Sequence, residues 1–280
     1  MRTIEDHPVR FGELAGPLLH GSTFFDWQLV STQEIAAAID YPFQEIVASG
    51  GIPYAPVVVN ASVRRYPTFE DVITVETYPR SVGDSSVELV YEVLDAEGDP
   101  LATARIVHVT IASDGDALPL PDRARSNLAE MIVSRDPQVG PTDDFGTNPL
   151  STFESSFPIR SPHVEGSELA YFEEYPGFAD VALEEYLREQ GTSKASVSGE
   201  KQPFRVRNWR WEFKSPVRLE TTLRVECEVV TADADTFRVL HTFSSDSRTH
   251  IEGTTEYGCF DRSGDSVAFE PEMVAPFAGT

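Results

Sequence analysis

Two glutamates, Glu13 and Glu168, precede two segments of helical character with the same layout. Each begins the tripeptide Glu-Leu-Ala, and a short loop then leads to an amphipathic run. A carboxylate can act as a general base or as a nucleophile. The unpaired amides at a helix N-terminus carry partial positive charge, so they suit an oxyanion. The spacing predicts that Glu13 faces the amides near His20 and Gly21, and that Glu168 faces those near Tyr175.

Residue type alone leaves a second interpretation open. A glutamate beside a helix start can be only a favourable partner of the helix dipole, worth a few tenths of a kcal/mol. His20 could act as an acid through its ring, although its backbone is the favoured donor. The loop around Glu13 is apolar, whereas the second loop carries Glu173 and Glu174, which would repel an anionic ligand. This difference favours the first copy as the working site.

The elements that must position these residues occur twice in the same order. In the first half we expect a strand at 8–13, a helix at 22–39, and four alternating runs that form an antiparallel meander at 55–66, 71–81, 85–95 and 101–113. In the second half we expect a strand at 157–168, a helix at 177–191, and four further strands at 203–215, 221–232, 236–246 and 249–261. This self-similarity, with a period of roughly 150 residues, indicates an internal duplication.

The expected fold class is α+β, with two tandem modules at 1–118 and 156–265. Residues 119–155 are rich in Pro, Gly, Asp and Thr, so we expect a linker with one short helix. Residues 266–280 are expected to form a tail.

The charge of the chain restricts its partners. The formal net charge is −24, the only lysines are Lys194, Lys201 and Lys214, and the acidic residues are spread along the chain. This distribution favours an acidic coat suited to concentrated salt over an acidic interaction surface. It argues against nucleic acid, which needs a basic face.

The remaining composition predicts a cytoplasmic protein without a cofactor or metal. No run approaches the roughly 18 apolar residues of a membrane span, and the first residues lack the apolar core of a signal peptide. Cys227 and Cys259 fall in strand-like runs and are expected to be buried free thiols, although one disulfide between them is the alternative.

Residues 10–27, RFGELAGPLLHGSTFFDW, resemble the opening of the hot-dog acyl-CoA thioesterases of the 4-hydroxybenzoyl-CoA thioesterase-like branch. In that branch an acidic residue, a glycine and a Tyr or His precede the central helix, and Glu13, Gly16 and His20 occupy those places. Residues 168–180 are similar, with Tyr175 and the following proline matching the Tyr-Pro pair of the branch. The branch usually has aspartate at the two glutamate positions, and Tyr171 replaces the second glycine.

The resemblance covers both halves, 8–113 and 157–261. It implies a tandem double hot-dog that folds back as an intramolecular pseudo-dimer, with further homo-oligomerisation left open. It also implies hydrolysis of acyl-CoA thioesters to the acid and CoA, with Glu13 and Glu168 as the carboxylates and the helix-start amides as oxyanion donors. Two rival functions are a non-catalytic acyl-CoA-binding module and a hot-dog enoyl-CoA hydratase or dehydratase. The His-Asp pair typical of the latter is absent from the sequence.

Further residues are candidates for substrate contacts. The positive side chains could meet CoA phosphates or form ion pairs on the strand surface, and Asp26 could contact ligand or be a solvated helix residue. The candidates are Gly16, Asp26, Arg64, Arg65 and Lys214.

Overall fold

The computed structural model describes residues 1–112, 116–135, 137, 139, 148–166, 169–246 and 248–278. The first module begins with a strand, a 3₁₀ helix and a short hairpin: β1 (Arg2–Pro8), η1 (Phe11–Glu13), β2 (Leu14–Ala15) and β3 (Leu18–Leu19). Two helices follow, α1 (Gly21–Ala38) and α2 (Phe43–Ala48). Four long strands complete the module: β4 (Ile52–Val63), β5 (Val72–Val82), β6 (Ser86–Leu94) and β7 (Pro100–Ile111).

The second module repeats this order after a connecting helix, α3 (Asp122–Glu130). Its first elements are β8 (Ser151–Pro158), η2 (Ser161–His163), α4 (Glu174–Glu189) and α5 (Lys194–Ser198). Its long strands are β9 (Gln202–Phe213), β10 (Thr222–Ala232), β11 (Phe237–Ser245) and β12 (Arg248–Phe260). Three short elements end the chain: β13 (Ser266–Val267), α6 (Pro271–Val274) and η3 (Ala275–Phe277).

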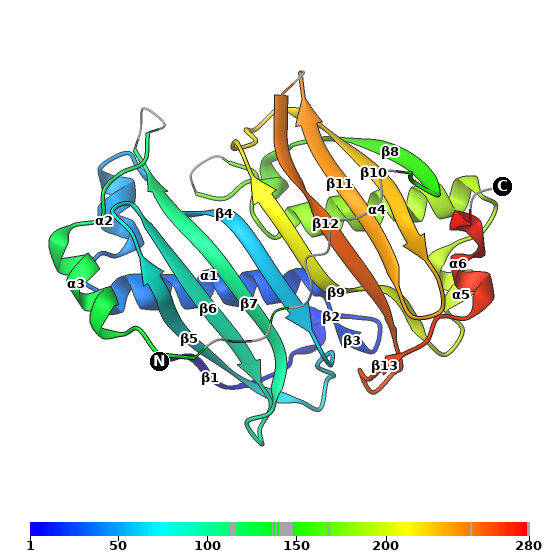
Figure 1. The fold of residues 1–280 in the computed structure, drawn as a ribbon, viewed down its shortest axis with the longest axis horizontal. Coiled ribbons are helices and arrows are strands. Elements are labelled where there is room, and N and C mark those ends of the chain that lie inside the picture. Colours follow the sequence, from blue (N-terminus) through cyan, green and yellow to red (C-terminus); the bar gives the residue numbers. More distant parts are fainter. Residues whose placement is uncertain are drawn as a thin grey trace.

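One antiparallel sheet runs through both modules in the order β1-β5-β6-β7-β4-β9-β12-β11-β10-β8. The modules join where β4 pairs with β9, in a register that places Asn60 opposite Arg210 and is symmetric about that pair. Figure 1 shows α1 and α4 on the same side of this sheet, one across each half. The predicted tandem hot-dog architecture is therefore confirmed.

The long helices are held by the apolar faces that they bury. In α1 the buried side chains include Phe24, Phe25, Trp27 and Ile35, which pack against the sheet. Full burial of one such side chain contributes about 1.5–3 kcal/mol. Leu29 on the same helix is only partly buried and lines a cavity described below.

Several local predictions were wrong. The strand expected at 8–13 is β1, which ends at Pro8, and η1 follows it; the strand expected at 157–168 is β8, which likewise ends at Pro158. The helix expected from residue 22 begins at Gly21, and its N-cap is His20, whose Nδ1 accepts the Ser22 amide at 3.2 Å. The last elements of the chain pack on the second module, with Phe269 and Phe277 buried.

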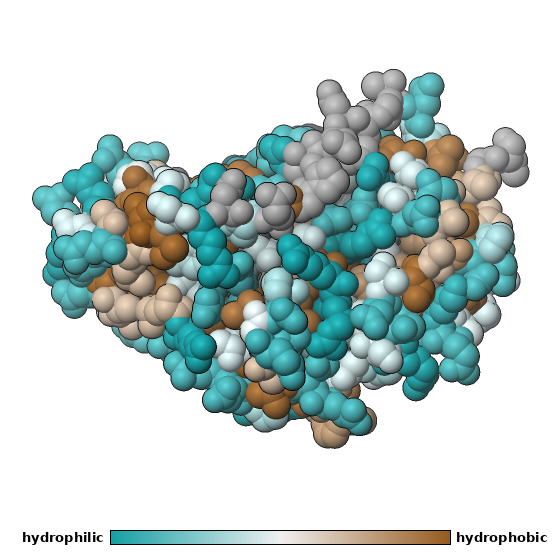
Figure 2. Space-filling view, turned by 60° about the horizontal axis from the view of Figure 1, so that its bottom comes forward, coloured by the Kyte–Doolittle hydropathy of each residue, from teal (hydrophilic) through white to brown (hydrophobic). Residues whose placement is uncertain are grey.

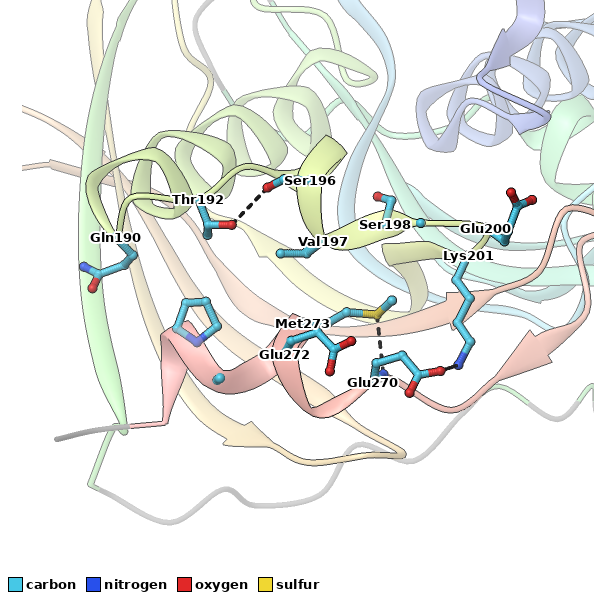
Figure 3. Close-up of a pocket in the computed structure, with 13 residues that line it drawn as sticks. Gln190, Thr192, Ser196, Val197, Ser198, Glu200, Lys201, Glu270, Glu272 and Met273 are labelled. Atoms are coloured by element: carbon cyan, nitrogen blue, oxygen red, sulfur yellow. Dashed lines mark hydrogen bonds and ion pairs between the residues drawn. The ribbon is translucent and has the colours of Figure 1, made fainter.

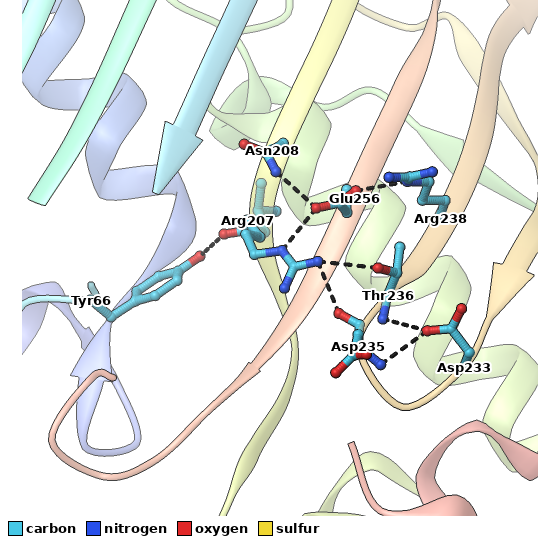
Figure 4. A network of polar contacts seen from close by, with 9 residues as sticks. Tyr66, Arg207, Asn208, Asp233, Asp235, Thr236, Arg238 and Glu256 are labelled. Carbon is cyan, nitrogen blue, oxygen red and sulfur yellow. Dashed lines mark hydrogen bonds and ion pairs between the residues drawn. The ribbon is translucent and has the colours of Figure 1, made fainter. Parts of the chain in front are cut away.

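Polar contacts support the junction between the modules (Figure 4). The hydroxyl of Tyr66 donates to the carbonyl of Val206 at 2.7 Å, which ties the first module to β9. Beside it, the buried Glu256 accepts hydrogen bonds from Arg207 and Asn208 at 2.8 Å and from Arg238 at 2.7 Å. Three donors thus converge on one carboxylate across neighbouring strands.

Hydrophilic residues dominate the face shown in Figure 2, and the hydrophobic ones form small separate groups. No helix among the described residues is long and apolar enough to cross a membrane. Cys227 and Cys259 are buried free thiols.

Candidate active site

A groove of about 750 Å³ lies between the two modules at the start of α4. The first module supplies one wall from α1, α2 and β4, including Leu29, Phe43 and Ala55. The second module supplies the other wall from the segment that leads into α4, including Phe172 and Tyr175. Most of the lining side chains are apolar, and a cavity of this size and character suits a ligand with a long hydrocarbon part.

The groove opens into a second, polar pocket of about 850 Å³. This pocket is lined by Lys214, Arg218, Asp246, Arg248 and His250, among others. Arg218 and Arg248 form no ion pair with the part of the chain that the structure describes. The two cavities share the residues where they meet: Val47, Ile52, Ile111, Gly166, Leu169, Lys214 and Pro216.

The start of α4 has free backbone donors, and one of them belongs to Phe172, which lines the groove. The amides of Phe172 and Glu173 bond to no acceptor among the described residues, and Glu173 makes no side-chain cap. At the start of α1, by contrast, the ring of His20 accepts the Ser22 amide. Unpaired amides at a helix start attract negative charge. The helix start at the groove is therefore the better anion site of the two.

Hydrogen bonds define which residues correspond in the two modules. The His20 amide donates to the carbonyl of Glu13 at 2.8 Å, and the Tyr171 amide donates to that of His163 at 2.8 Å. Each of these acceptor residues ends a 3₁₀ helix and caps it with its own side chain. The counterpart of Glu13 is therefore His163, and the predicted superposition of Glu13 on Glu168 was wrong. Glu168 itself lies outside the described residues, between Gly166 and Leu169, which line both cavities.

The carboxylate of Glu13 is engaged by residues that precede it in the chain. It accepts the amide of Arg10 at 2.7 Å and contacts Nε2 of His7 at 2.9 Å. Only the backbone carbonyl of Glu13 reaches the start of the helix, where it accepts the His20 amide and the hydroxyl of Thr23. The predicted approach of this carboxylate to the amides near His20 and Gly21 is not present.

The first-module counterpart of the groove is polar. Glu165 and Ala55 line the groove, and their counterparts are Ala15 and Arg205. These counterparts are joined by a direct hydrogen bond from Arg205 to the Ala15 carbonyl. Arg205 also donates to Gln202 at 3.3 Å, and Gly16 closes against both side chains. The other groove residues Leu29, Gln33, Phe43 and Val47 correspond to Asp180, Glu184, Lys194 and Ser198.

Charges gather around His20 in this counterpart. Burial lowers the pKa of His20, the nearby Asp180 raises it, and Arg205 and Lys194 lower it further. Burial raises the pKa of Asp180, although Lys194, Arg205 and His20 oppose this shift. The cluster thus places charged and polar side chains of both modules at positions whose counterparts line the groove with mostly apolar side chains.

A pair of carboxylates lies where α1 meets α4. Asp26 accepts a hydrogen bond from the hydroxyl of Tyr171 at 3.1 Å, and Tyr171 lines the groove. Burial, with the charges of Asp26 and Glu174, raises the pKa of Glu173 to about 7. Asp26 thus holds a groove residue through its hydroxyl and does not itself line the groove.

The remaining predicted residues fall in different places. Tyr175 and Lys214 line the groove, and the hydroxyl of Tyr175 has no hydrogen-bond partner among the described residues. Lys214 also forms an ion pair with Glu252. Arg65 pairs with Asp71 at 2.9 Å, and neither Arg64 nor Arg65 lines the groove. For Arg65 the interpretation as a surface ion pair therefore holds.

A serine–histidine pair that the sequence did not predict lies at the junction of the two cavities. Ser215 lines the groove, and its Oγ lies 2.9 Å from Nδ1 of His250; Nε2 of that ring lies 2.6 Å from Oγ of Ser245. Burial lowers the pKa of His250, although the Ser215 carbonyl raises it. Ser215 lies 35 residues before His250, and Ser245 and His250 belong to neighbouring strands on either side of a turn, so no sequence motif indicated them.

Another cleft, of about 780 Å³, lies between α5 and α6 (Figure 3). Charged and polar side chains line it together with apolar ones such as Val197 and Met273, and Lys201 pairs with Glu270 at its edge. It borders Gln190, at the opposite end of α4 from Tyr175, about 22 Å away along the helix. It is therefore separate from the groove and from the free amides.

No family model matches the sequence, and no curated protein matches it. Solved structures match along nearly the whole chain. A protein from Lactobacillus plantarum assigned as an oleoyl thioesterase has a TM-score of 0.69 at 14% identity, covering 90% of this chain and 93% of its own. A 12:0-ACP thioesterase from Umbellularia californica has a TM-score of 0.67 at 12% identity, covering 89% and 94%. An acyl-ACP thioesterase from Bacteroides thetaiotaomicron has a TM-score of 0.65 at 12% identity, covering 92% and 96%. At these identities the similarity establishes the shared double hot-dog fold.

Proposed function

We propose that this protein hydrolyses acyl thioesters and that the working site is the groove at the start of α4. One observation carries the proposal: an apolar groove, lined by Phe172 with its free amide, meets a pocket that carries Arg218 and Arg248. The acyl chain would lie in the groove, and the phosphorylated arm of the thiol carrier would lie over Arg218 and Arg248. The names of the structural neighbours are consistent with this chemistry.

The reaction needs a base, an oxyanion site and a departing thiol. A carboxylate removes a proton from water, and the water oxygen attacks the thioester carbonyl. The amides of Phe172 and Glu173 stabilise the resulting oxyanion. The C–S bond then breaks, the thiolate takes up the proton, and the products are the free acid and the thiol.

Glu168 is the candidate for this carboxylate. Its described neighbours, Gly166 and Leu169, line the junction of the two cavities, where the thioester would lie. Glu13 is engaged by His7 and Arg10 in the other module. We therefore assign the carboxylate role to the second copy, in place of the first copy that the loop composition favours.

A matched pair of variants tests the position of the site. Release of thiol from octanoyl-, dodecanoyl- and hexadecanoyl-CoA is followed with a thiol reagent. Ala55→Arg copies the counterpart residue into the groove and should reduce turnover to near background. Arg205→Ala removes the equivalent guanidinium from the first module and should keep most of the parental rate. Melting temperatures of both variants serve as folding controls.

Each outcome bears on the proposal. Loss of turnover in Arg205→Ala, with Ala55→Arg fully active and both folded, would place the site in the first module. A parent protein that binds these acyl-CoAs without releasing thiol would be a binding module instead. Hydration of an enoyl-CoA without thiol release would favour the hydratase.

A further inference from the structure

A buried polar chain runs through the core of the first module to the groove wall. Nε2 of His108 lies 2.7 Å from the hydroxyl of Tyr91, which lies 2.7 Å from the hydroxyl of Thr32 on α1. Nδ1 of His108 lies 2.7 Å from the backbone carbonyl of Tyr54. These side chains are all buried. A carbonyl can only accept, so Nδ1 must carry the proton and Nε2 accepts from Tyr91.

Tyr54, which lines the groove, has an unusual backbone conformation. Its φ is +45°, a backbone conformation that side-chain-bearing residues rarely adopt. Its ring stacks on that of Phe43 with the ring centres 5.4 Å apart, and Tyr54 and Phe43 both line the groove. The hydroxyl of Tyr54 donates to the carbonyl of Tyr41 at 3.3 Å. A strained conformation persists only where its surroundings determine it. The hydrogen bond from His108 fixes the carbonyl of this residue.

The second module has the same backbone feature without the polar chain. Phe204 corresponds to Tyr54 and has a φ of +57°. The strand pairing places Tyr257 at the position of His108 and His241 at that of Tyr91. No side chain in the described part of the molecule donates to the carbonyl of Phe204. The imidazole bond is thus specific to the module whose β4 forms the groove wall.

We infer that His108 is a positioning residue for acyl-chain selectivity: its Nδ1–H holds the carbonyl of Tyr54 and thereby keeps the Tyr54 and Phe43 rings in the groove wall. The inference rests on the proposed function for its kinetic readout. Burial lowers the pKa of His108 to about 4, so the ring is neutral near pH 7 and the bond persists there. Without it, the peptide between Tyr54 and Ala55 can rotate and the ring can shift with it; the positive φ itself does not depend on this bond, because Phe204 keeps one without it.

Two variants test the hydrogen bonds of the two ring nitrogens of His108 separately. His108→Asn places an amide N–H near the position of Nδ1, so it can still donate to Tyr54. His108→Gln places its amide near Nε2, so it keeps a partner in Tyr91 and loses Tyr54. Both change a buried residue and should lower the melting temperature. The ratio of kcat/KM for dodecanoyl-CoA to that for hexadecanoyl-CoA should stay near the parental value in His108→Asn and shift about tenfold or more in His108→Gln, the effect of a small misfit in an apolar pocket.

Other results overturn the inference. The bond to Tyr54 does not set selectivity if the kcat/KM ratio shifts equally in both variants or in neither. A shift in the ratio only in His108→Asn would contradict the inference as well. If neither variant folds, ¹⁵N spectra of the parental histidines decide: a neutral His108 protonated at Nε2 would contradict the proposed bond. If the parent releases no thiol, the proposed function fails. The inference is then tested by the affinity of the same variants for cis-parinaric acid in the groove, with the same expected contrast.

Discussion

At the scale of single residues, the two glutamates of the repeated tripeptide should behave differently. Glu168→Gln removes the proposed base and should lower kcat by about 10²–10⁴-fold. Glu13→Gln keeps an acceptor for the amide of Arg10 and should leave kcat near the parental value, with a modest fall in melting temperature. The measurement is thiol release at saturating acyl-CoA. If Glu13→Gln lost thiol release while Glu168→Gln kept it, the working site would lie in the first module.

Glu173 should give a pH-dependent stability effect. Burial, with the charges of Asp26 and Glu174, raises its pKa to about 7, so the native state binds this proton more tightly than the unfolded chain. Its protonation therefore supports the native state at low pH, and this support is lost as the pH rises toward about 7. Glu173→Gln should raise the melting temperature at about pH 8 and change it little at about pH 5. Asp26→Asn, which also relieves the carboxylate pair, should act in the same direction, whereas equal effects at both pH values would contradict the shift.

The sequence could predict candidate residue types but not their partners. Tyr175 and Lys214 do line the groove, because they lie near the helix start and the strand end that the pattern located. The match of Glu13 to Glu168 came from the repeated tripeptide Glu-Leu-Ala. The hydrogen bonds of the two loops instead show that Glu13 and His163 are at equivalent positions. The loop of the second module is one residue longer between that position and the helix, and its hydrogen bonds determine the alignment.

At the scale of elements, the cluster around Glu256 should stabilise the second module. Desolvation would raise the pKa of Glu256, but the hydrogen bond from Arg238, the charge of Arg207 and the bond from Asn208 lower it overall. This contribution is present above the pKa of the unfolded chain and is lost as the pH falls through the lowered native value. Glu256→Gln should cost about 1–3 kcal/mol near pH 7, and its stability should converge with that of the parent in acid.

Urea unfolding at the two pH values measures this effect. Glu226→Gln is the matched control, because Glu226 pairs with Arg224 at 3.2 Å on the exposed surface. Exposed pairs contribute about 0–1 kcal/mol, so this variant should be nearly neutral. A similar cost for both substitutions would show that burial of the Glu256 cluster adds nothing.

Most long elements were predictable because their apolar residues alternate or repeat with helical period. The meander strands and both central helices were found in this way, with errors of a few residues at their ends. The short helices α2 and α5 were missed, because five or six residues carry too little periodic signal. The groove could not be predicted, because it depends on which residues of one module face the helix start of the other. Leu29 and Asp180 hold corresponding places, yet one lines a cavity and the other lies beside an arginine.

At the scale of the whole molecule, the net charge of −24 should make stability depend on salt. Like charges spread over the surface repel one another, and added salt screens this repulsion beyond about 10 Å at 0.1 M and about 3 Å at 1 M. The melting temperature should therefore rise as KCl increases from about 0.1 M to a few molar. Sucrose at matched water activity is a control for general exclusion effects. A melting temperature that is flat or falls with KCl would contradict the proposed halophilic coat.

The pairing of β4 with β9 has a consequence for how such a protein can change over generations. In a dimer of two identical chains, every substitution enters both sites, so an arginine that blocks one groove blocks the other. Here one gene encodes both halves, and Ala55 and Arg205 can differ. Joining the halves in one chain therefore allows one groove to be closed by a hydrogen bond between the modules, while the other groove stays open. Two copies of either half alone would then form a different pair of sites from the one in this chain.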